Sequence, residues 1–150
     1  MKFQLSGAAI VLTGVIVDQL TKWAASFYLA YGSDIVLIPK VLSLTLVHNY
    51  GAAYGILSTQ RMLLITLSTV VIFGSMFFYS KIATSRWSAV GLLFLWSGAI
   101  GNLIDRVARG YVIDFFNIHI IPVFNIADIL INVAVACFLA EAIFTKRHSQ

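Results

Sequence analysis

Charged side chains are scarce in this chain. Only 11% of its 150 residues are Asp, Glu, Lys or Arg, whereas 60% are hydrophobic. Soluble domains carry roughly 25% charged residues, so this composition argues against a soluble protein and is typical of a membrane protein. The net charge is +4, but the basic residues are scattered and no basic patch is interleaved with aromatic residues. The sequence therefore does not indicate a nucleic-acid-binding surface.

Cysteine and histidine are also rare, with one and three residues respectively. Cys137 lies in an apolar run and has no partner for a disulfide within the chain, so we interpret it as a buried, inert thiol. His48, His119 and His148 lack any spacing that metal ligands share. We therefore expect neither a metal nor a cofactor.

Four apolar segments have about the length of roughly 20 residues that a membrane-spanning helix needs. They cover residues 5–29, 62–79, 87–104 and 123–144. We expect an all-α membrane protein with four transmembrane helices, forming one domain over residues 1–150. Pro122 suits the first turn of the fourth helix.

The charges favour one orientation of these four helices. Four crossings place both termini and the short loop 80–86 on the same side of the membrane. Five basic residues and one acidic residue lie on that side, whereas five basic and five acidic residues lie on the other. The more positive side is expected to be cytoplasmic. Both termini are therefore predicted to be cytoplasmic.

The first exoplasmic connection contains a strand pattern. Leu42, Leu44 and Leu46 alternate with other residues up to Asn49, and this period of two predicts a strand. Small residues follow, including Gly51, and would let the backbone pass close to another group. We expect the second connection, residues 107–122, to be a loop.

Most of the acidic residues lie where charge is expensive. Asp18, Asp105, Asp114 and Asp128 lie in or beside the apolar segments, toward the predicted exoplasmic end. An ionisable group in hydrocarbon costs several kcal/mol unless it is paired or hydrated, so such residues mark functional sites. This arrangement predicts a polar site at that end of the helices.

The spacing of the polar residues places them on common helix faces. Asp18 and Lys22 are four residues apart in the favourable order for an ion pair, and Asn102 and Arg106 have the same spacing. Asn125 precedes Asp128 by three residues at the entry of the fourth helix. Three helices thus present polar faces at one depth, where we expect the second connection to bring Asp114.

Two buried carboxylates near one another share a proton, because burial and like charge raise one pKa. In aspartic proteases the ionised member takes a proton from water while the protonated member polarises the scissile carbonyl. Amides such as Asn49 or Asn102 could bind substrate or a developing oxyanion. From spacing alone, a catalytic pair and a structural pair are equally good interpretations.

Five motifs, in this order, resemble those of bacterial lipoprotein signal peptidase (signal peptidase II, or prolipoprotein signal peptidase, aspartic peptidase family A8). The resemblance covers nearly the whole chain. The motifs are Asp18-Gln19-x-Thr21-Lys22, Asn49-x-Gly51-Ala52-Ala53-Tyr54-Gly55, Gly98-x-x-Gly101-Asn102-x-x-Asp105-Arg106, Val112-x-Asp114-Phe115 and Phe124-Asn125-x-Ala127-Asp128.

The resemblance implies a function. Members of the family remove signal peptides from diacylglyceryl-modified prolipoproteins, cleaving before the lipidated cysteine, and globomycin-type peptides inhibit them. The matching motifs imply that Asp114 and Asp128 are the catalytic dyad. They also imply a small exoplasmic β-cradle over residues 36–49 and a loop helix within residues 50–58. The expected protein is a monomer of the bacterial inner membrane, with its site toward the periplasmic side and membrane lipid around it.

The remaining polar residues have supporting interpretations. We interpret Asn49, Asn102 and Arg106 as substrate contacts, and Asp18 with Lys22 as a supporting ion pair. Asp105 either contacts substrate or braces Arg106 or the loop backbone. Further supporting residues are Gln19, Thr21, Gly51, Tyr54 (where the family commonly has Phe or Trp) and Asn125.

Two other protein classes are compatible with polar groups in apolar segments. A small exporter could use Asp18 as a proton-coupled binding residue. Transporter sites lie near the membrane midplane, however, and here the polar motifs gather at one end. A membrane scaffold would not need so many buried acids. Both interpretations are weaker than that of an enzyme.

Overall fold

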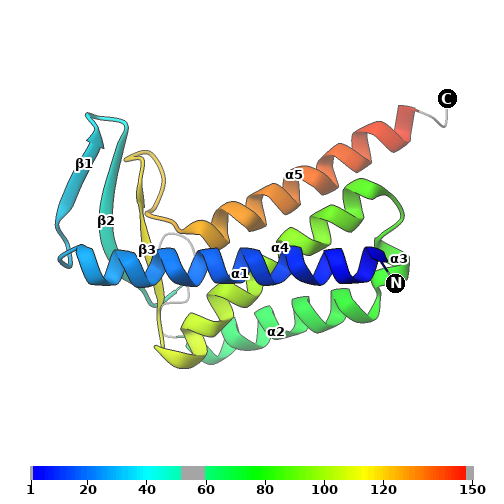
Figure 1. Cartoon of the computed structure of the whole chain (residues 1–150), viewed down its shortest axis with the longest axis horizontal. Helices are drawn as coiled ribbons and strands as arrows, with labels where there is room; N and C mark the ends of the chain where they lie inside the picture. The colour runs from blue at the N-terminus through cyan, green and yellow to red at the C-terminus, as the bar shows by residue number, and fades with distance from the viewer. Residues whose placement is uncertain (1, 52–59, 148–150) are drawn as a thin grey trace.

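Helices and a small sheet occupy opposite ends of the computed structural model, which describes residues 2–51 and 60–147 (Figure 1). The helices are α1 (Lys2–Tyr28), α2 (Arg61–Phe77), α3 (Tyr79–Ile82), α4 (Arg86–Ala108) and α5 (Ile126–Arg147). The strands are β1 (Asp34–Ile38), β2 (Leu42–Asn49) and β3 (Val112–Asn117). Both termini lie at the end of the bundle opposite the sheet (Figure 1).

Helix α4 is the centre of the bundle, since α1, α2 and α5 all pack against it. Glycines make this close packing possible. A Cβ at Gly98 would lie 2.3 Å from the carbonyl oxygen of Ala127 in α5, and a Cβ at Gly14 of α1 would lie 2.7 Å from the Cβ of Ser97. Glycines at these two positions therefore allow α5 and α1 to pack closely on α4.

Three helical segments are long and apolar enough to cross a membrane: Ser6–Tyr28, Arg86–Ala108 and Ile126–Phe144. Helix α2 is apolar but has only 17 residues, so the fourth predicted crossing stays a prediction. The third helix continues four residues beyond the predicted end at position 104, which places Asp105 and Arg106 inside α4.

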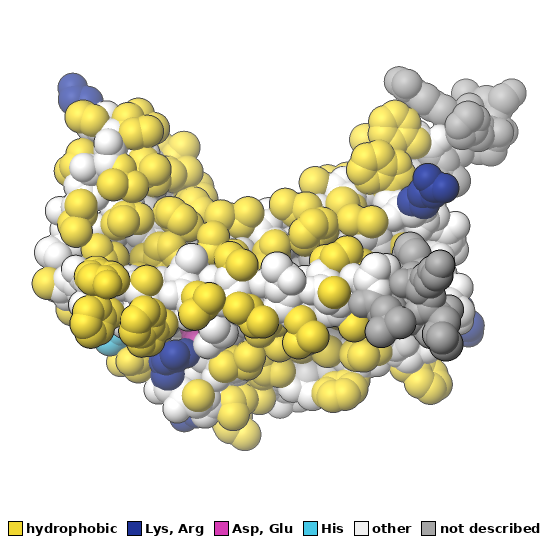
Figure 2. Space-filling view, viewed as in Figure 1, with side chains coloured by type: hydrophobic (Ala, Val, Ile, Leu, Met, Phe, Trp, Pro, Cys, Tyr) yellow, Lys and Arg dark blue, Asp and Glu magenta, His cyan; other side chains and the backbone are white. Residues whose placement is uncertain are grey.

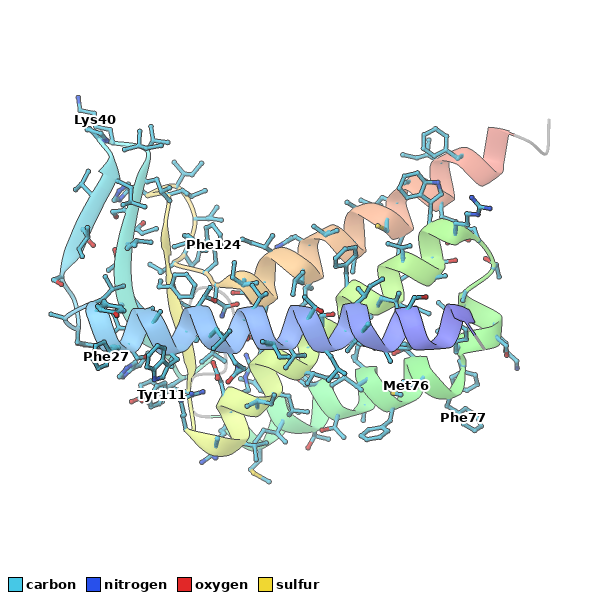
Figure 3. The ribbon with its side chains drawn as sticks, in the orientation of Figure 1. Phe27, Lys40, Met76, Phe77, Tyr111 and Phe124 are labelled. Atoms are coloured by element: carbon cyan, nitrogen blue, oxygen red, sulfur yellow. The ribbon has the colours of Figure 1, made fainter. Side chains whose placement is uncertain are left out.

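The surface of the helices is apolar and their interior is partly polar. Leu12, Phe73 and Phe77 are 62%, 65% and 82% exposed, and Figure 3 shows Phe77 pointing away from the bundle. In Figure 2, hydrophobic side chains cover most of the visible helix surface. The side chains of Asp18 and Lys22, by contrast, are fully buried. This distribution suits a bundle surrounded by lipid.

The sheet is antiparallel, with strand order β1-β2-β3. Strand β2 has the bounds that alternation predicted, and it pairs with β3 so that Val47 lies opposite Asp114. Behind this pair, Leu46 and Phe115 pack with Leu29, the residue that follows α1, in an apolar cluster. The sheet thereby fixes Asp114 over the ends of the helices.

Two local predictions were wrong. The connection 107–122 is not a simple loop, because it contains β3. Residues 112–115 of this strand are buried on both faces, so the sequence shows no alternation there. Pro122 does not begin the fourth helix either, since α5 starts at Ile126. The loop helix predicted within residues 50–58, including Tyr54, lies outside the described residues except for Tyr50 and Gly51, which are not helical.

Candidate active site

Asp114 lies in the middle of β3 and is 2% exposed. Its Oδ1 accepts a hydrogen bond from Nδ2 of Asn125 at 2.6 Å, and its Oδ2 accepts one from Nδ2 of Asn49 at 2.9 Å. Strand β2 supplies Asn49 and the residue before α5 supplies Asn125. The carboxylate is therefore held from two sides by amide donors.

Asp128 lies in the first turn of α5. Its Oδ1 accepts from Nδ2 of Asn102 at 2.9 Å, and its Oδ2 accepts from the main-chain N–H of Asn125 at 3.2 Å. The N–H of Asp128 in turn donates to Oδ1 of Asn125 at 2.9 Å. This reciprocal pair caps the start of α5, as a capping box does, and explains why the helix starts here and not at Pro122.

Asn125 connects the two aspartates. Its side-chain amide reaches Asp114 and its main chain reaches Asp128, while the residue itself is fully buried. The neighbouring Phe124 forms an antiparallel bridge with Phe116 of β3 and comes close to that strand in Figure 3. The strand carrying Asp114 and the helix carrying Asp128 are thus joined directly through their backbones.

Asn102 is oriented by its neighbours. Its Oδ1 accepts from Nζ of Lys22 at 2.9 Å and from Nδ2 of Asn125 at 3.2 Å. The NH₂ group must therefore point to Asp128. The residue is 6% exposed, and these contacts favour orientation of Asp128 over direct contact with substrate.

Lys22 is the centre of a buried ion network. Its Nζ lies 2.8 Å from Oδ2 of Asp18 and 3.0 Å from Oδ2 of Asp105, and all three side chains are fully buried. The predicted Asp18–Lys22 pair is present. Asp18 also accepts from the main-chain N–H of Ala127 at 2.8 Å, so it stabilises the first turn of α5.

Asp105 braces the backbone of β3. It accepts from the N–H of Ile113 at 3.2 Å and forms an ion pair with Arg109. Gln19 donates to it at 3.2 Å. Arg109 was missed by the sequence analysis, although its spacing of four residues from Asp105 is the rule that identified the Asp18–Lys22 pair.

Arg106 and Gly51 lie at the edge of the site. Nη2 of Arg106 donates to the carbonyl oxygen of Gly51 at 3.3 Å, and the N–H of Gly51 donates to Oδ1 of Asn49 at 2.9 Å. Thr21, by contrast, donates to main-chain carbonyls of its own helix. The structure thus brings together all the predicted site residues within the described ranges except Thr21.

The environment of Asp114 changes its acidity. Burial, and secondarily the charge of Asp128, raises the pKa of Asp114 to about 7, although the hydrogen bonds from Asn49 and Asn125 act in the opposite direction. Near neutral pH both protonation states of Asp114 are therefore accessible. Within residues 2–51 and 60–147, no group of three His, Cys, Asp or Glu side chains is placed to hold a metal. The expectation of a metal-free site stays a prediction.

Two carboxylates linked through Asn125, at one end of a bundle with three helices long and apolar enough to cross a membrane, are compatible with a membrane enzyme of the aspartic peptidase class. Residues 10–144 match the family described as Signal peptidase (SPase) II. The chain belongs to this family of aspartic peptidases. Membership decides between the enzyme and the exporter in favour of the enzyme.

The similarity extends over nearly the full length of the relatives. The chain is 37% identical to a lipoprotein signal peptidase of Clostridium novyi, covering 94% of this chain and 97% of the relative. It is 36% identical to one of Lactococcus lactis subsp. lactis, covering 98% and 99%. A solved structure described as a bacterial membrane enzyme determined by the in meso method superimposes with a TM-score of 0.90. It shares 30% identity, over 97% of this chain and 92% of that chain.

Proposed function

We propose that this protein removes the signal peptide from diacylglyceryl-modified prolipoproteins, cleaving before the lipidated cysteine. Asp114 and Asp128 activate the attacking water. The observation that carries the proposal is the connection of both carboxylates to one buried residue, Asn125. Family membership supports the substrate class.

The two carboxylates differ in their surroundings, which supports separate roles. Asp114 is 2% exposed, whereas the side chain of Asp128 is only partly buried. We assign Asp128 as the base. Asp114, whose pKa is raised to about 7, holds the proton.

The reaction then proceeds in two steps. Asp128 takes a proton from water as the water oxygen attacks the scissile carbonyl carbon, and Asp114 gives its proton to the carbonyl oxygen. As the tetrahedral intermediate collapses, that oxygen returns its proton to Asp114. Asp128 passes its proton to the departing amine nitrogen, so both carboxylates regain their initial states.

Arg106 supplies further donors at the edge of this site. A guanidinium carries five N–H donors in a planar fork, and in this structure Gly51 accepts from one of them. We assign the remaining donors to substrate backbone carbonyls or to ester oxygens of the diacylglycerol. Globomycin-type peptides would occupy the same place.

The membrane position follows from the same proposal. Both termini lie opposite the sheet, which agrees with cytoplasmic termini and a site at the exoplasmic face of the bacterial inner membrane (Figure 1). This orientation requires that α2 also crosses the membrane. The diacylglycerol of the substrate then enters from the outer leaflet. We expect the monomer to be sufficient, since one chain supplies both aspartates.

The assignment of the dyad is tested by Asp114→Asn and Asp128→Asn in purified protein with a lipidated signal-peptide substrate. Each amide has nearly the shape of the acid but cannot cycle a proton, so cleavage should fall by more than about 1,000-fold. Asp34→Asn is the matched control, because Asp34 is an exposed acid of β1 that hydrogen-bonds to Thr45. Near-normal turnover by either dyad variant would show that the assignment is wrong.

A further inference from the structure

Arg61, the first residue of α2, reaches across to the end of α4. Its Nε donates to the carbonyl oxygen of Arg106 at 2.8 Å and its Nη2 to that of Val107 at 3.0 Å. These carbonyls belong to the last turn of α4, where main-chain oxygens have no partner within the helix. A guanidinium satisfies them and complements the negative end of the helix dipole.

The residue whose carbonyl Arg61 holds also reaches the site. The side chain of Arg106 donates to the carbonyl oxygen of Gly51, and the N–H of Gly51 donates to Asn49. The amide of Asn49 donates to Oδ2 of Asp114 at 2.9 Å. Hydrogen bonds through Arg106, Gly51 and Asn49 therefore connect Arg61 with Asp114.

Arg61 also lies against the turn that leads into β3. Gly110, between α4 and β3, has φ of 88°, a left-handed conformation that favours glycine. A Cβ at this position would lie 3.3 Å from Nη1 of Arg61. The guanidinium therefore contacts both the end of α4 and the turn that directs the chain toward Asp114.

We propose that Arg61 is a positioning residue for cleavage: it fixes the end of α4 so that Arg106 and Asn49 keep their places beside Asp114. This inference rests on the proposed function. Arg61 does not touch the dyad, and its position at the start of an apolar helix also fits a simple interfacial anchor. A positioning residue would affect cleavage only while the Arg106 side chain is present, whereas an interfacial anchor would act independently of Arg106.

A double-mutant cycle in the detergent-purified enzyme separates these roles. Arg61→Gln should lower kcat/KM about tenfold, because small displacements of catalytic groups are costly. Arg61→Lys, which keeps the charge but not the fork, should give an intermediate loss. In a protein that already carries Arg106→Ala, Arg61→Gln should lower kcat/KM by less than about twofold, because the Arg106 side chain through which Arg61 acts is absent.

Arg86→Gln is the charge-matched control, since Arg86 is the first residue of α4 at the other end of the bundle. It should leave kcat/KM unchanged, and the melting temperature of every variant is measured beside it. Wild-type kcat/KM for Arg61→Gln, or an equal loss with and without Arg106, would overturn the inference. If Arg61→Gln does not fold, Arg61→Lys is carried through the same cycle. The outcome is separate from that of the proposed function, which fails only if Asp114→Asn or Asp128→Asn remains active.

Discussion

The side chains of Asp114 and Asp128 accept hydrogen bonds from amide groups, whereas the other buried acids of the site are paired with cations. Asp114 accepts from Asn49 and Asn125, whereas Lys22 is directed to Asp18 and Asp105. A lysine in direct contact with the proposed dyad would favour two ionised carboxylates and remove the proton that the proposed mechanism needs. Lys22 instead reaches Asp128 only through Asn102, which accepts from Lys22 and donates to Asp128. The network can therefore orient Asp128 without placing a positive charge in contact with either Asp114 or Asp128.

The pH dependence of cleavage provides a test of this arrangement. Because the proposed mechanism needs a proton on Asp114, kcat/KM should decline as pH rises above about 7. The hydrogen bond from Asn49 lowers the pKa of Asp114, so Asn49→Ala should move the alkaline limb to higher pH. Profiles of kcat/KM from about pH 5 to about pH 9 measure this shift independently of any loss in absolute rate.

Thr45→Val is the control, because Thr45 lies on the same strand and hydrogen-bonds to Asp34. Its alkaline limb should coincide with that of the wild type. An alkaline limb for Asn49→Ala that is unchanged or moved toward acid would contradict the assignment of the proton to Asp114.

Local spacing revealed some of these contacts and not others. The Asp18–Lys22 pair follows from a helical spacing of four, and the same rule applied once more would have found Arg109 beside Asp105. The contact of Asn125 with Asp114 depends on how β3 is paired, so spacing could not show it. Arg61 donates to main-chain carbonyl oxygens. Every residue has such an oxygen, so the sequence does not indicate which ones Arg61 contacts.

A strand was predictable where its sequence alternates between leucine and other residues. In strand β2 the sequence alternates leucine with other residues from Leu42 to Leu46, and the predicted bounds agree with the structure, although the buried residues, Ser43 and Leu46, do not follow a period of two. All residues of β1 are exposed and the first four of β3 are buried, so neither strand has a two-residue pattern. Such strands are recognised only once their neighbours are known.

Packing between α4 and α5 depends on the absence of a side chain at Gly98. In Gly98→Ala, the new Cβ would lie 2.3 Å from the carbonyl oxygen of Ala127, and backbone cannot yield as a flexible side chain does. We expect a loss of about 1–3 kcal/mol in the free energy of unfolding, as in overpacked cores. Activity should fall as well, because Ala127 is adjacent to Asp128. Thermal unfolding in detergent measures the first effect.

Gly74→Ala is the matched control in α2, because among the described residues a Cβ at this position would meet no atom within 4 Å beyond its chain neighbours and its own helix backbone. It should be neutral, or stabilising by up to about 1 kcal/mol through helix propensity. Equal melting temperatures for the two variants would show that α4 and α5 do not pack as described.

For the whole molecule, apolar surface and a polar site at one end predict a requirement for lipid on the substrate. Each CH₂ group removed from water contributes about 0.8 kcal/mol, so the acyl chains of the proposed substrate would hold it in the membrane and concentrate it at the site. With peptides of one sequence, KM should fall as the acyl chains on the cysteine lengthen, and the unlipidated peptide should be cleaved very slowly. A peptide acylated at a distant lysine is the control. Equal rates for all peptides would indicate a general membrane peptidase.

The central position of α4 has a consequence for how the chain is made. Helix α1 leaves the ribosome long before α4, and within the described residues it packs on α4 and α5 but hardly on α2. Lys22 is therefore expected to enter the membrane before Asp105 has been translated. Asp18, one turn earlier in the same helix, lies 2.8 Å from Lys22 in the folded protein, and this pair needs only α1, so it would leave the segment without net charge during insertion. The local ion pair would keep α1 stable in the lipid until α4 is inserted and Asp105 completes the network.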